Sequence, residues 1–359
     1  MSEKTQEQIL MKGNEAIAEA ACRAGCLAYY GYPITPQNEL IGYMAKRLPE
    51  LGRIFIQAES EVSAINMVYG SASCGVRAMT SSSSPGISLK QEGISYAAGA
   101  DIPLVFVNIV RGGPGLGSIA PAQSDYFQST RGGGHGDYHV ICLAPASVQE
   151  ACDLTYAAFD MADTWRVPVM ILGDGVIGQM MEGITLPPMR DLSSLPSKAS
   201  WAVGNMKGRA ARHITSINLV PAELEKLIRE RFERYAAIAE KEVRYEEKNC
   251  QDAKVILVAY GTSARICQGA LEKARAKGLP VGLFRPISVW PFPSSQLSSY
   301  ATPEMTYLSV EMSMGQMVED IRLAVNGKAP VELLSHSGGV LPTEEEIVSR
   351  IERILEGKA

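Results

Sequence analysis

The chain has 359 residues, of which 46% are hydrophobic and 20% charged, and its formal net charge at pH 7 is −5. At roughly 100–200 residues per domain this length suggests two or three globular domains, and the composition excludes collagen, coiled coils and disordered proteins. The mildly acidic balance includes no basic block that would bind a phosphate backbone, so we expect no nucleic-acid partner.

From residue 11 to about residue 174, predicted helices alternate with short apolar strands. The predicted strands span 26–30, 53–57, 76–80, 103–110, 139–143 and 168–172, and the predicted helices span 14–24, 37–47, 61–71, 87–98 and 148–161. Strands that are apolar throughout predict a mostly parallel sheet that is buried on both faces, with helical crossovers. We therefore expect a doubly wound α/β domain over residues 1–185.

The composition changes from residue 184, where prolines and serines predict an irregular connector, followed by a charged helix over 222–247. A second, smaller α/β unit follows. Its predicted strands span 255–259, 281–284, 306–310 and 331–334, and its predicted helices span 263–277, 315–325 and 343–356. We therefore divide the chain into residues 1–185, a connector at 186–250, and a second domain at 251–359.

Nothing in the sequence predicts a membrane segment. The longest apolar runs, 103–110 and 254–260, are far shorter than the roughly 20 residues that a spanning helix needs. The N-terminal segment is polar and contains acidic residues, unlike a secretory or transit peptide. The seven cysteines are scattered rather than arranged as a disulfide framework. We therefore expect a cytoplasmic location.

Metal-binding patterns are missing from the sequence. Cys22 and Cys26 have the i, i+4 spacing of a predicted helix, with no other cysteine or histidine nearby, and we interpret them as core residues. The chain has no C-x2-C-x2-C run of the kind that holds iron–sulfur clusters. Any clusters that the function needs are therefore expected in another subunit.

Four loops follow strands of the first unit, at 31–36, 58–61, 80–86 and 111–117. They should meet at the carboxyl edge of the sheet, where doubly wound folds bind ligands. Arg111 ends a buried strand there, and a guanidinium in that place needs an anion or a carboxylate partner.

The polar residues of these loops also have purely structural explanations. Glu61, like Glu59, would lie near the start of a helix, where the helix dipole stabilises an acid. Thr35 could cap a helix with Pro36 at its first position. Segment 80–86 could be a serine-rich cap.

Five motifs in the chain carry a family resemblance. They are Gly31-Tyr-Pro-Ile-Thr-Pro36, Ala58-Glu-Ser-Glu-Val-Ser-Ala64, Thr80-Ser-Ser-Ser-Ser-Pro-Gly86, Val107-Asn-Ile-Val-Arg-Gly-Gly-Pro114 and Phe284-Arg-Pro-Ile-Ser-Val-Trp-Pro-Phe-Pro293. With them the chain resembles the α subunits of 2-oxoacid:ferredoxin oxidoreductases over residues 11–358. The resemblance implies the pyrimidine-binding domain of a thiamine diphosphate enzyme and a transketolase C-terminal-like second domain. Stretches 111–125 and 131–138 most resemble the branched-chain (3-methyl-2-oxobutanoate) type, and the 2-oxoglutarate type is next.

The resemblance also implies roles for individual residues. By the family pattern Glu61, and not Glu59, would face the cofactor's pyrimidine ring. Activation of the cofactor requires a ring nitrogen that is protonated or strongly hydrogen-bonded. A carboxylate in a dry pocket can supply this hydrogen bond. Thr35 would lie near the reacting carbonyl, and Arg111 would hold the substrate carboxylate. The residues implied to line the cofactor pocket are Ser82, Ser83, Ser84, Pro85 and Gly86.

Gly173-Asp174-Gly175 matches the first part of the diphosphate- and metal-binding signature of these enzymes. The chain then enters the connector, and Asn205 is the only later candidate for the second part. We interpret Asp174 as a strand-end residue and expect no metal site in this chain. The resemblance places the diphosphate domain, with its Mg²⁺, in a separate β subunit, so this chain alone should not turn over.

The implied reaction is the CoA-dependent oxidative decarboxylation of a 2-oxo acid to acyl-CoA and CO2. Electrons would reach ferredoxin through iron–sulfur clusters in partner subunits, with γ and ferredoxin-like δ subunits expected beside β. One alternative is an NAD-dependent dehydrogenase, which would need a glycine fingerprint where the chain has 32–35. Another is a non-catalytic scaffold, which the presence of Glu61, Thr35 and Arg111 argues against.

Overall fold

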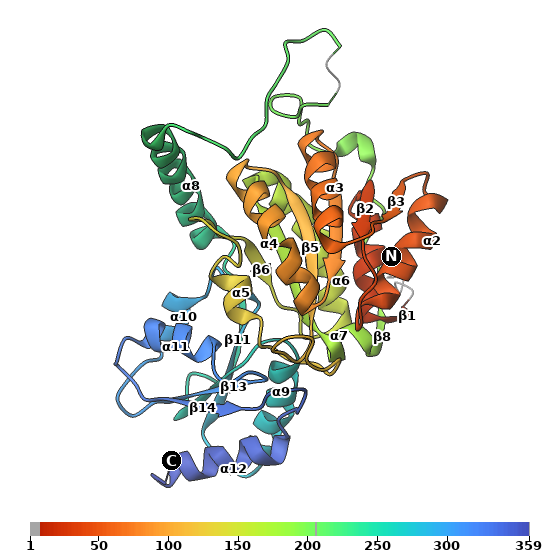
Figure 1. Cartoon of the computed structure of the whole chain (residues 1–359). Helices are drawn as coiled ribbons and strands as arrows, with labels where there is room; N and C mark the ends of the chain where they lie inside the picture. Colours follow the sequence, from red (N-terminus) through yellow and green to blue (C-terminus); the bar gives the residue numbers. More distant parts are fainter. Residues whose placement is uncertain (1–7, 205–206, 359) are drawn as a thin grey trace, which may run out of the picture.

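The computed structural model describes residues 8–204 and 207–358. It contains two α/β units, each built on a mostly parallel sheet (Figure 1). A connector of irregular structure leaves the first unit and leads into a long helix, α8 (Pro221–Lys241). Among the described residues, no helix combines the length and the apolar character that crossing a membrane requires.

The first sheet has seven strands. They are β2 (Ala28–Gly31), β3 (Ile54–Gln57), β4 (Ala78–Ser82), β5 (Leu104–Val110), β6 (Ile141–Leu143), β7 (Pro168–Asp174) and β12 (Ser288–Trp290). Their order is β12-β6-β7-β5-β4-β2-β3, and every neighbouring pair is parallel except β12–β6. Every residue of β5 and β7 is buried, as their continuous apolar sequences predict, whereas the edge strand β3 is mostly exposed.

Helices cover both faces of this sheet. On one face lie α1 (Gly13–Arg23), α2 (Asn38–Glu50) and α6 (Val148–Trp165), and on the other lie α3 (Glu61–Ser73) and α4 (Ser84–Gly99). This arrangement follows from right-handed crossovers between parallel strands. The predicted doubly wound class is therefore confirmed, and the carboxyl ends of β2 to β5 share one edge.

The second sheet has five strands and helices on both sides. Its strands are β9 (Tyr245–Lys248), β10 (Val255–Val258), β11 (Val281–Pro286), β13 (Thr306–Glu311) and β14 (Val331–Ser335). Its helices are α9 (Gly261–Ala276), α10 (Ser294–Ser298), α11 (Met317–Val325) and α12 (Glu344–Leu355). The order is β14-β13-β10-β11-β9, with only β9 antiparallel to its neighbour.

Several elements differ from the sequence prediction. The helix predicted over 222–247 is wrong at its C-terminal end, because α8 stops at Lys241 and residues 245–248 form β9. The missed short elements are β1 (Ile9–Lys12), β8 (Met181–Ile184), β12, α5 (Tyr126–Thr130), α7 (Gly175–Gln179), α10 and the 3-10 turn η1 (Leu192–Ser194). Strands β1 and β8 pair with each other in an antiparallel ribbon.

The two units are joined by more than the connector. Strand β12 follows β11 directly but pairs antiparallel with β6, so the C-terminal half contributes an edge strand to the first sheet. Arg285 of β11 also forms a bidentate ion pair with Glu150 of α6, at 2.7 and 2.8 Å. The division of the chain at residues 185 and 250 stays a prediction.

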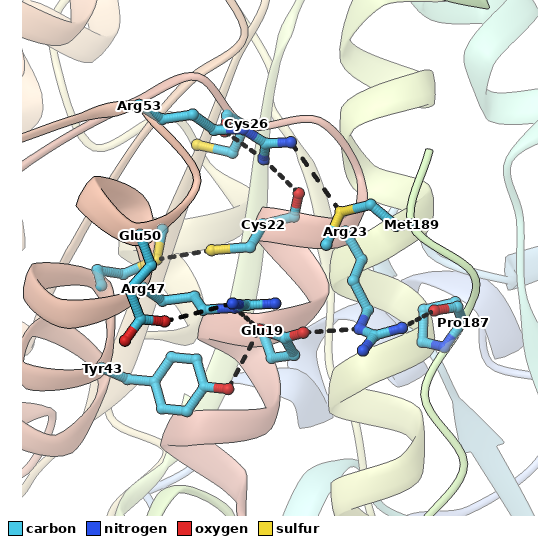
Figure 2. Close-up of polar contacts among 11 residues, drawn as sticks. Glu19, Cys22, Arg23, Cys26, Tyr43, Arg47, Glu50, Arg53, Pro187 and Met189 are labelled. Carbon is cyan, nitrogen blue, oxygen red and sulfur yellow. Dashed lines mark hydrogen bonds and ion pairs between the residues drawn. The ribbon is translucent and has the colours of Figure 1, made fainter. Parts of the chain in front are cut away.

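Helices α1 and α2 are joined through the buried carboxylate of Glu19 (Figure 2). Arg23 and Arg47 donate to its two oxygens at 2.7 and 3.0 Å, and the Tyr43 hydroxyl donates at 3.1 Å. Arg23 also donates to the carbonyl of Pro187 and so ties the connector to α1. Beside this cluster, Cys22 and Cys26 are fully buried, and burial raises the pKa of the Cys22 thiol to about 12. Their prediction as core residues is confirmed.

Candidate active site

The predicted site residues lie at the carboxyl edge of the first sheet. Glu61 is the first residue of α3, whose N-cap Ser60 accepts a hydrogen bond from the backbone of Ser63. The Glu61 side chain is only 6% exposed. Glu59 is exposed instead, and it accepts hydrogen bonds from the Ser60 and Ser63 hydroxyls, which lower its pKa. The helix start therefore buries one acid of this pair and exposes the other.

Gly86 forms the wall against which the Glu61 carboxylate lies. A Cβ atom at Gly86 would lie 2.6 Å from Glu61 Oε1 and 2.0 Å from Ser82 Oγ, so no side chain fits there. Within residues 8–204 and 207–358, no hydrogen bond or ion pair to this carboxylate is found, and its oxygens are not among the fully buried polar atoms. The buried hydroxyls of Ser82 and Ser83 also have no partner in the described chain. Such unpartnered buried groups fit a site that receives a polar ligand.

The serine segment does not cap a helix with its side chains. Helix α4 begins at Ser84, earlier than predicted, with Pro85 in its first turn, and its N-cap Ser83 makes no side-chain capping bond. The Ser84 hydroxyl instead bonds to the backbone of Arg111, and the backbone N–H of Ser84 donates to the side-chain oxygen of Asn108. The alternative of a serine-rich cap is therefore wrong, and the segment links β4 to β5.

Thr35 lies in a turn that other side chains hold in place. Asn14 and Gln179 both donate to the carbonyl of Pro36 and to the carboxylate of Glu39. Helix α2 begins only at Asn38, without a side-chain cap, so the alternative that Thr35 caps it with Pro36 at the first position is wrong. The Thr35 hydroxyl accepts a hydrogen bond from the Asn38 side chain at 3.2 Å.

Arg111 connects the turn of Thr35 with the glycine-rich loop. Its guanidinium donates to the carbonyl of Thr35 at 2.9 Å and to that of Leu116 at 3.0 Å. The side chain is 8% exposed, and its Nε has no partner in the described chain. The carboxylate partner that we expected as one possibility is not found among the described residues. A buried guanidinium with a free donor can still bind an anion.

Lys90 is a residue of this region that the sequence interpretation missed. It lies on α4, one helical turn after Gly86, and is fully buried. Its Nζ donates to Thr80 Oγ1 at 2.6 Å and to the Ser81 carbonyl at 2.9 Å. The signal in the sequence was its spacing of four residues from Gly86, which places both on one helix face.

Asp174 has a structural role, as predicted. It ends β7 and caps α7, and its Oδ1 accepts hydrogen bonds from the backbone of Val176 and Ile177 and from the Thr262 hydroxyl. Burial raises its pKa, and the hydrogen bonds act in the opposite direction. Among the described residues, no group of three or more His, Cys, Asp or Glu side chains could hold a metal ion. Asn205 lies outside the described residues.

A cavity of about 760 Å³ lies elsewhere, between α6, α9 and β11. Glu150, Glu246, Arg265 and Arg285 line it, and none of the residues of the proposed site does. The Arg285 charge there is already neutralised by Glu150 and Glu246. This cavity therefore does not coincide with the predicted site around Glu61.

Family models match both units. The model described as "Pyruvate flavodoxin/ferredoxin oxidoreductase, thiamine diP-bdg" matches residues 19–247. The model described as "Pyruvate:ferredoxin oxidoreductase core domain II" matches residues 253–347. The matched thiamine diphosphate-binding region contains Glu61, Thr35, Arg111 and the segment 82–86.

Similar proteins share the organisation of the whole chain. The chain is 50% identical to the ketoisovalerate oxidoreductase subunit VorB of Methanothermobacter marburgensis over 345 residues, which is 96% of this chain and 97% of the relative. It is 34% identical to the 2-oxoglutarate synthase subunit KorA of Methanothermobacter thermautotrophicus, over 96% of this chain and 98% of the relative.

A solved structure also matches nearly the full length. It is the 2-oxoglutarate:ferredoxin oxidoreductase from Magnetococcus marinus, with a TM-score of 0.84 and 25% identity, and the match covers 98% of this chain and 66% of that chain. The chain therefore belongs to the pyruvate flavodoxin/ferredoxin oxidoreductase family and carries its thiamine diphosphate-binding domain.

Proposed function

We propose that this chain is the subunit that supplies the pyrimidine side of the thiamine diphosphate site in a branched-chain 2-oxoacid:ferredoxin oxidoreductase. The complex would convert a 2-oxo acid such as 3-methyl-2-oxobutanoate, with CoA, to acyl-CoA and CO2. The observation that carries the proposal is the buried carboxylate of Glu61, which lies without a protein partner against Gly86 at the carboxyl edge of the sheet. The similarity to a ketoisovalerate oxidoreductase subunit supports the branched-chain substrate.

The residues around Glu61 fit the cofactor. When bound, thiamine diphosphate supplies a carbon nucleophile and an electron sink for decarboxylation. Glu61 would bind the ring nitrogen, since a carboxylate accepts a hydrogen bond from a protonated ring atom and favours that protonated form. The unpartnered hydroxyls of Ser82 and Ser83 would bond to the polar edge of the ring, and the bare backbone of Gly86 leaves room beside them.

Arg111 and Thr35 would bind the substrate. The free Nε of Arg111 can pair with the carboxylate of the 2-oxo acid, while its other nitrogens stay on the carbonyls of Thr35 and Leu116. The bond from Arg111 to the Thr35 carbonyl would therefore link the position of the Thr35 turn to the guanidinium that holds the substrate. Thr35 is half-buried as a residue, and its hydroxyl, whose bond from Asn38 is exposed, could donate to the reacting carbonyl.

The remaining parts of the enzyme would come from partner subunits. A β subunit would hold the diphosphate and Mg²⁺, since Asp174 is buried and its Oδ1 already accepts hydrogen bonds from α7 and Thr262. The γ and ferredoxin-like δ subunits would hold the iron–sulfur clusters that pass electrons to ferredoxin. We also propose a cytoplasmic location, because all seven cysteines are free, as in proteins of reducing compartments.

The second candidate substrate is 2-oxoglutarate, which the similarity to KorA supports at lower identity. Arg111 would serve the carboxylate that both substrates share and does not distinguish them. The ratio of kcat/KM for 3-methyl-2-oxobutanoate and 2-oxoglutarate, measured on the purified complex, decides between them. We expect the branched-chain acid to have the higher value.

Changing Glu61 to Gln in the complex tests the proposed mechanism. We expect turnover to fall at least about a hundredfold, the lower range for loss of an acid–base group. The matched control is Glu59→Gln, because Glu59 is an exposed acid two residues earlier, and its turnover should stay near the wild-type value. Wild-type turnover in Glu61→Gln, or an equal loss in both variants, would refute the assignment.

A further inference from the structure

A residue of the first unit occupies the place at the second sheet where doubly wound folds bind ligands. From β10 the chain adds β11 on one side and then β13 on the other, so the strand order reverses next to β10. Ligands of such sheets bind at this point, outside the carboxyl ends of the strands. Here the side chain of Gln123, from the segment after β5, is bonded to the ends of both β10 and β13 and is only 2% exposed.

Five hydrogen bonds join Gln123 to the second unit. Its Oε1 accepts from Ser263 Oγ at 2.7 Å and from the N–H of Met312 at 3.1 Å, and its Nε2 donates to the Tyr260 carbonyl at 2.8 Å. Its backbone N–H donates to the Met312 carbonyl at 2.8 Å, and its carbonyl accepts from the Tyr260 hydroxyl at 3.2 Å. A carboxylate or an apolar side chain in this place would leave buried polar groups without partners.

A carboxylate of the chain itself fills the neighbouring helix terminus. Glu311, at the end of β13, accepts hydrogen bonds from the backbone N–H groups of residues 316–318 at 2.8 to 3.0 Å. The hydroxyls of Ser309 and Ser313 donate to the same carboxylate. The start of α11 therefore already holds a negative charge. The groups at this edge that would bind a ligand are thus engaged by Glu311 and Gln123.

Gln123 follows the base of the glycine-rich loop 112–120 by two residues. At this base Arg111 and Pro121 form an antiparallel bridge. The loop is closed by a backbone hydrogen bond from its first residue to the carbonyl of its last, at 2.9 Å. Within it, the carbonyl of Leu116 accepts from the Arg111 guanidinium at 3.0 Å. The shape of the loop and the direction of the guanidinium are therefore linked.

The two arms of this loop are held by different units. On the first arm the backbone N–H of Arg111 donates to the Ser84 hydroxyl at 3.1 Å, which attaches this arm to the first unit. On the second arm Gln123 forms its bonds with the second unit. The second unit also touches the loop directly, since a Cβ atom at Gly339 would lie 2.3 Å from the Cβ of Ala120. The position of the second arm relative to β5 thus depends on the second unit.

We propose that Gln123 is a positioning residue of the substrate site, through which the second unit fixes loop 112–120 and thereby sets the affinity for the 2-oxo acid. The inference rests on the proposed function, since it takes Arg111 as the group that binds the substrate carboxylate. One of the bonds that orient this guanidinium goes to Leu116 of the loop. A displaced loop would therefore turn the guanidinium away from the substrate. The second unit would then take part in substrate binding and not only in assembly.

Hydrogen exchange of the full chain, without cofactor or partner subunits, tests whether Gln123 holds the loop. In Gln123→Met the side chain keeps a similar length but loses its three hydrogen bonds. We expect the backbone N–H groups of loop 112–120 to exchange at least about tenfold faster than in wild type, because the loop opens more easily. Mass spectrometry of peptides that cover the loop measures this rate. Ser263→Ala removes one of the three bonds and should give a smaller change in the same direction.

Steady-state kinetics of the complex test the effect on the substrate. In Gln123→Met we expect the KM for 3-methyl-2-oxobutanoate to rise at least about tenfold while kcat stays within about threefold, because the substrate is bound less well. A purely structural defect would lower the amount of active complex, and so the apparent kcat, without raising KM. The matched control is Glu150→Gln, which weakens another polar contact between the units, at Arg285. It should change neither loop exchange nor KM.

The outcomes separate this proposal from the proposed function. If loop exchange or KM keeps its wild-type value in Gln123→Met, or if both change equally in Glu150→Gln, Gln123 has only a structural role and the inference is wrong. Arg111→Gln should raise KM at least as much as Gln123→Met. An unchanged KM in Arg111→Gln would refute the substrate role of Arg111 in the proposed function, and the inference with it. A raised KM in Arg111→Gln with an unchanged KM in Gln123→Met would refute the inference alone.

Discussion

Replacing Lys90 with methionine should change how the stability of the chain depends on pH. An unfolded lysine has a pKa of 10.5, whereas burial lowers the pKa of Lys90 to about 7, against the attraction of Glu61. Between these two values the unfolded chain binds one proton more than the folded chain, so the free energy of unfolding rises with pH there. Below pH 7 both states bind the proton, and the full penalty of burying the charge applies.

The size of this effect follows from the two pKa values. Each pKa unit corresponds to about 1.4 kcal/mol, so the fall from 10.5 to about 7 is worth about 5 kcal/mol. Between pH 7 and pH 9 the wild-type chain should recover about half of this, or about 2–3 kcal/mol. At about 2 °C per kcal/mol for a chain of this size, that is a shift of about 5 °C in the unfolding midpoint.

Thermal unfolding of the full chain at several pH values between 7 and 9 measures the effect. The midpoint of wild type minus that of Lys90→Met should increase by about 5 °C over this range, because methionine has no proton to lose. The matched control is Lys226→Met, in which an exposed lysine of α8 is replaced and the difference should not vary with pH. A constant difference between wild type and Lys90→Met would refute the reasoning, since it would mean that Lys90 titrates alike in both states.

Three further substitutions follow from the contacts described above. Gly86→Ala should lower turnover of the complex about a hundredfold, because the Cβ of the alanine would displace the Glu61 carboxylate. The unfolding midpoint should change less than the activity, and full activity would contradict the tight contact. Glu19→Gln should lower the free energy of unfolding by about 3 kcal/mol in denaturant titrations, because Arg23 and Arg47 lose the charge that they share (Figure 2). A loss under about 0.5 kcal/mol would contradict this. Thr262→Val should lower the free energy of unfolding by about 1–3 kcal/mol, because the buried carboxylate of Asp174 loses a hydrogen-bond donor. Unchanged stability would show that this hydrogen bond is replaceable.

Much of the first sheet could be predicted because its strands have an unambiguous pattern. Strands β5 and β7 are apolar at nearly every position, so their burial follows from the sequence. The parallel order then places the loops after β2 to β5 at one edge, which brings Thr35, Glu61 and Arg111 into one region. That Glu61 rather than Glu59 is buried follows from the start of α3, which the sequence predicted correctly.

Other features depend on tertiary contacts that local patterns do not contain. Residues 245–248 have the sequence Tyr-Glu-Glu-Lys, which suits an exposed helix end as well as a strand, and only pairing with β11 makes them β9. Strand β12 has three residues and follows β11 without a loop, so nothing local predicts its pairing with β6. Lys90 stands in a polar run with Gln91 and Glu92 that is typical of a solvated helix, and only the tertiary packing of α4, with Lys90 bonded to Thr80 and Ser81 of β4, buries it.

Strand β12, which belongs to the C-terminal half but pairs within the first sheet, determines which truncations and proteolytic nicks the chain can tolerate. A fragment that ends before residue 251 would leave β6 as an open edge, with unpaired backbone groups that invite self-association. A protease that nicks the exposed stretch 207–220 should instead release neither half, because β12 and the Arg285–Glu150 pair still join them. Expression of the separated halves would therefore succeed best when both are made in the same cell.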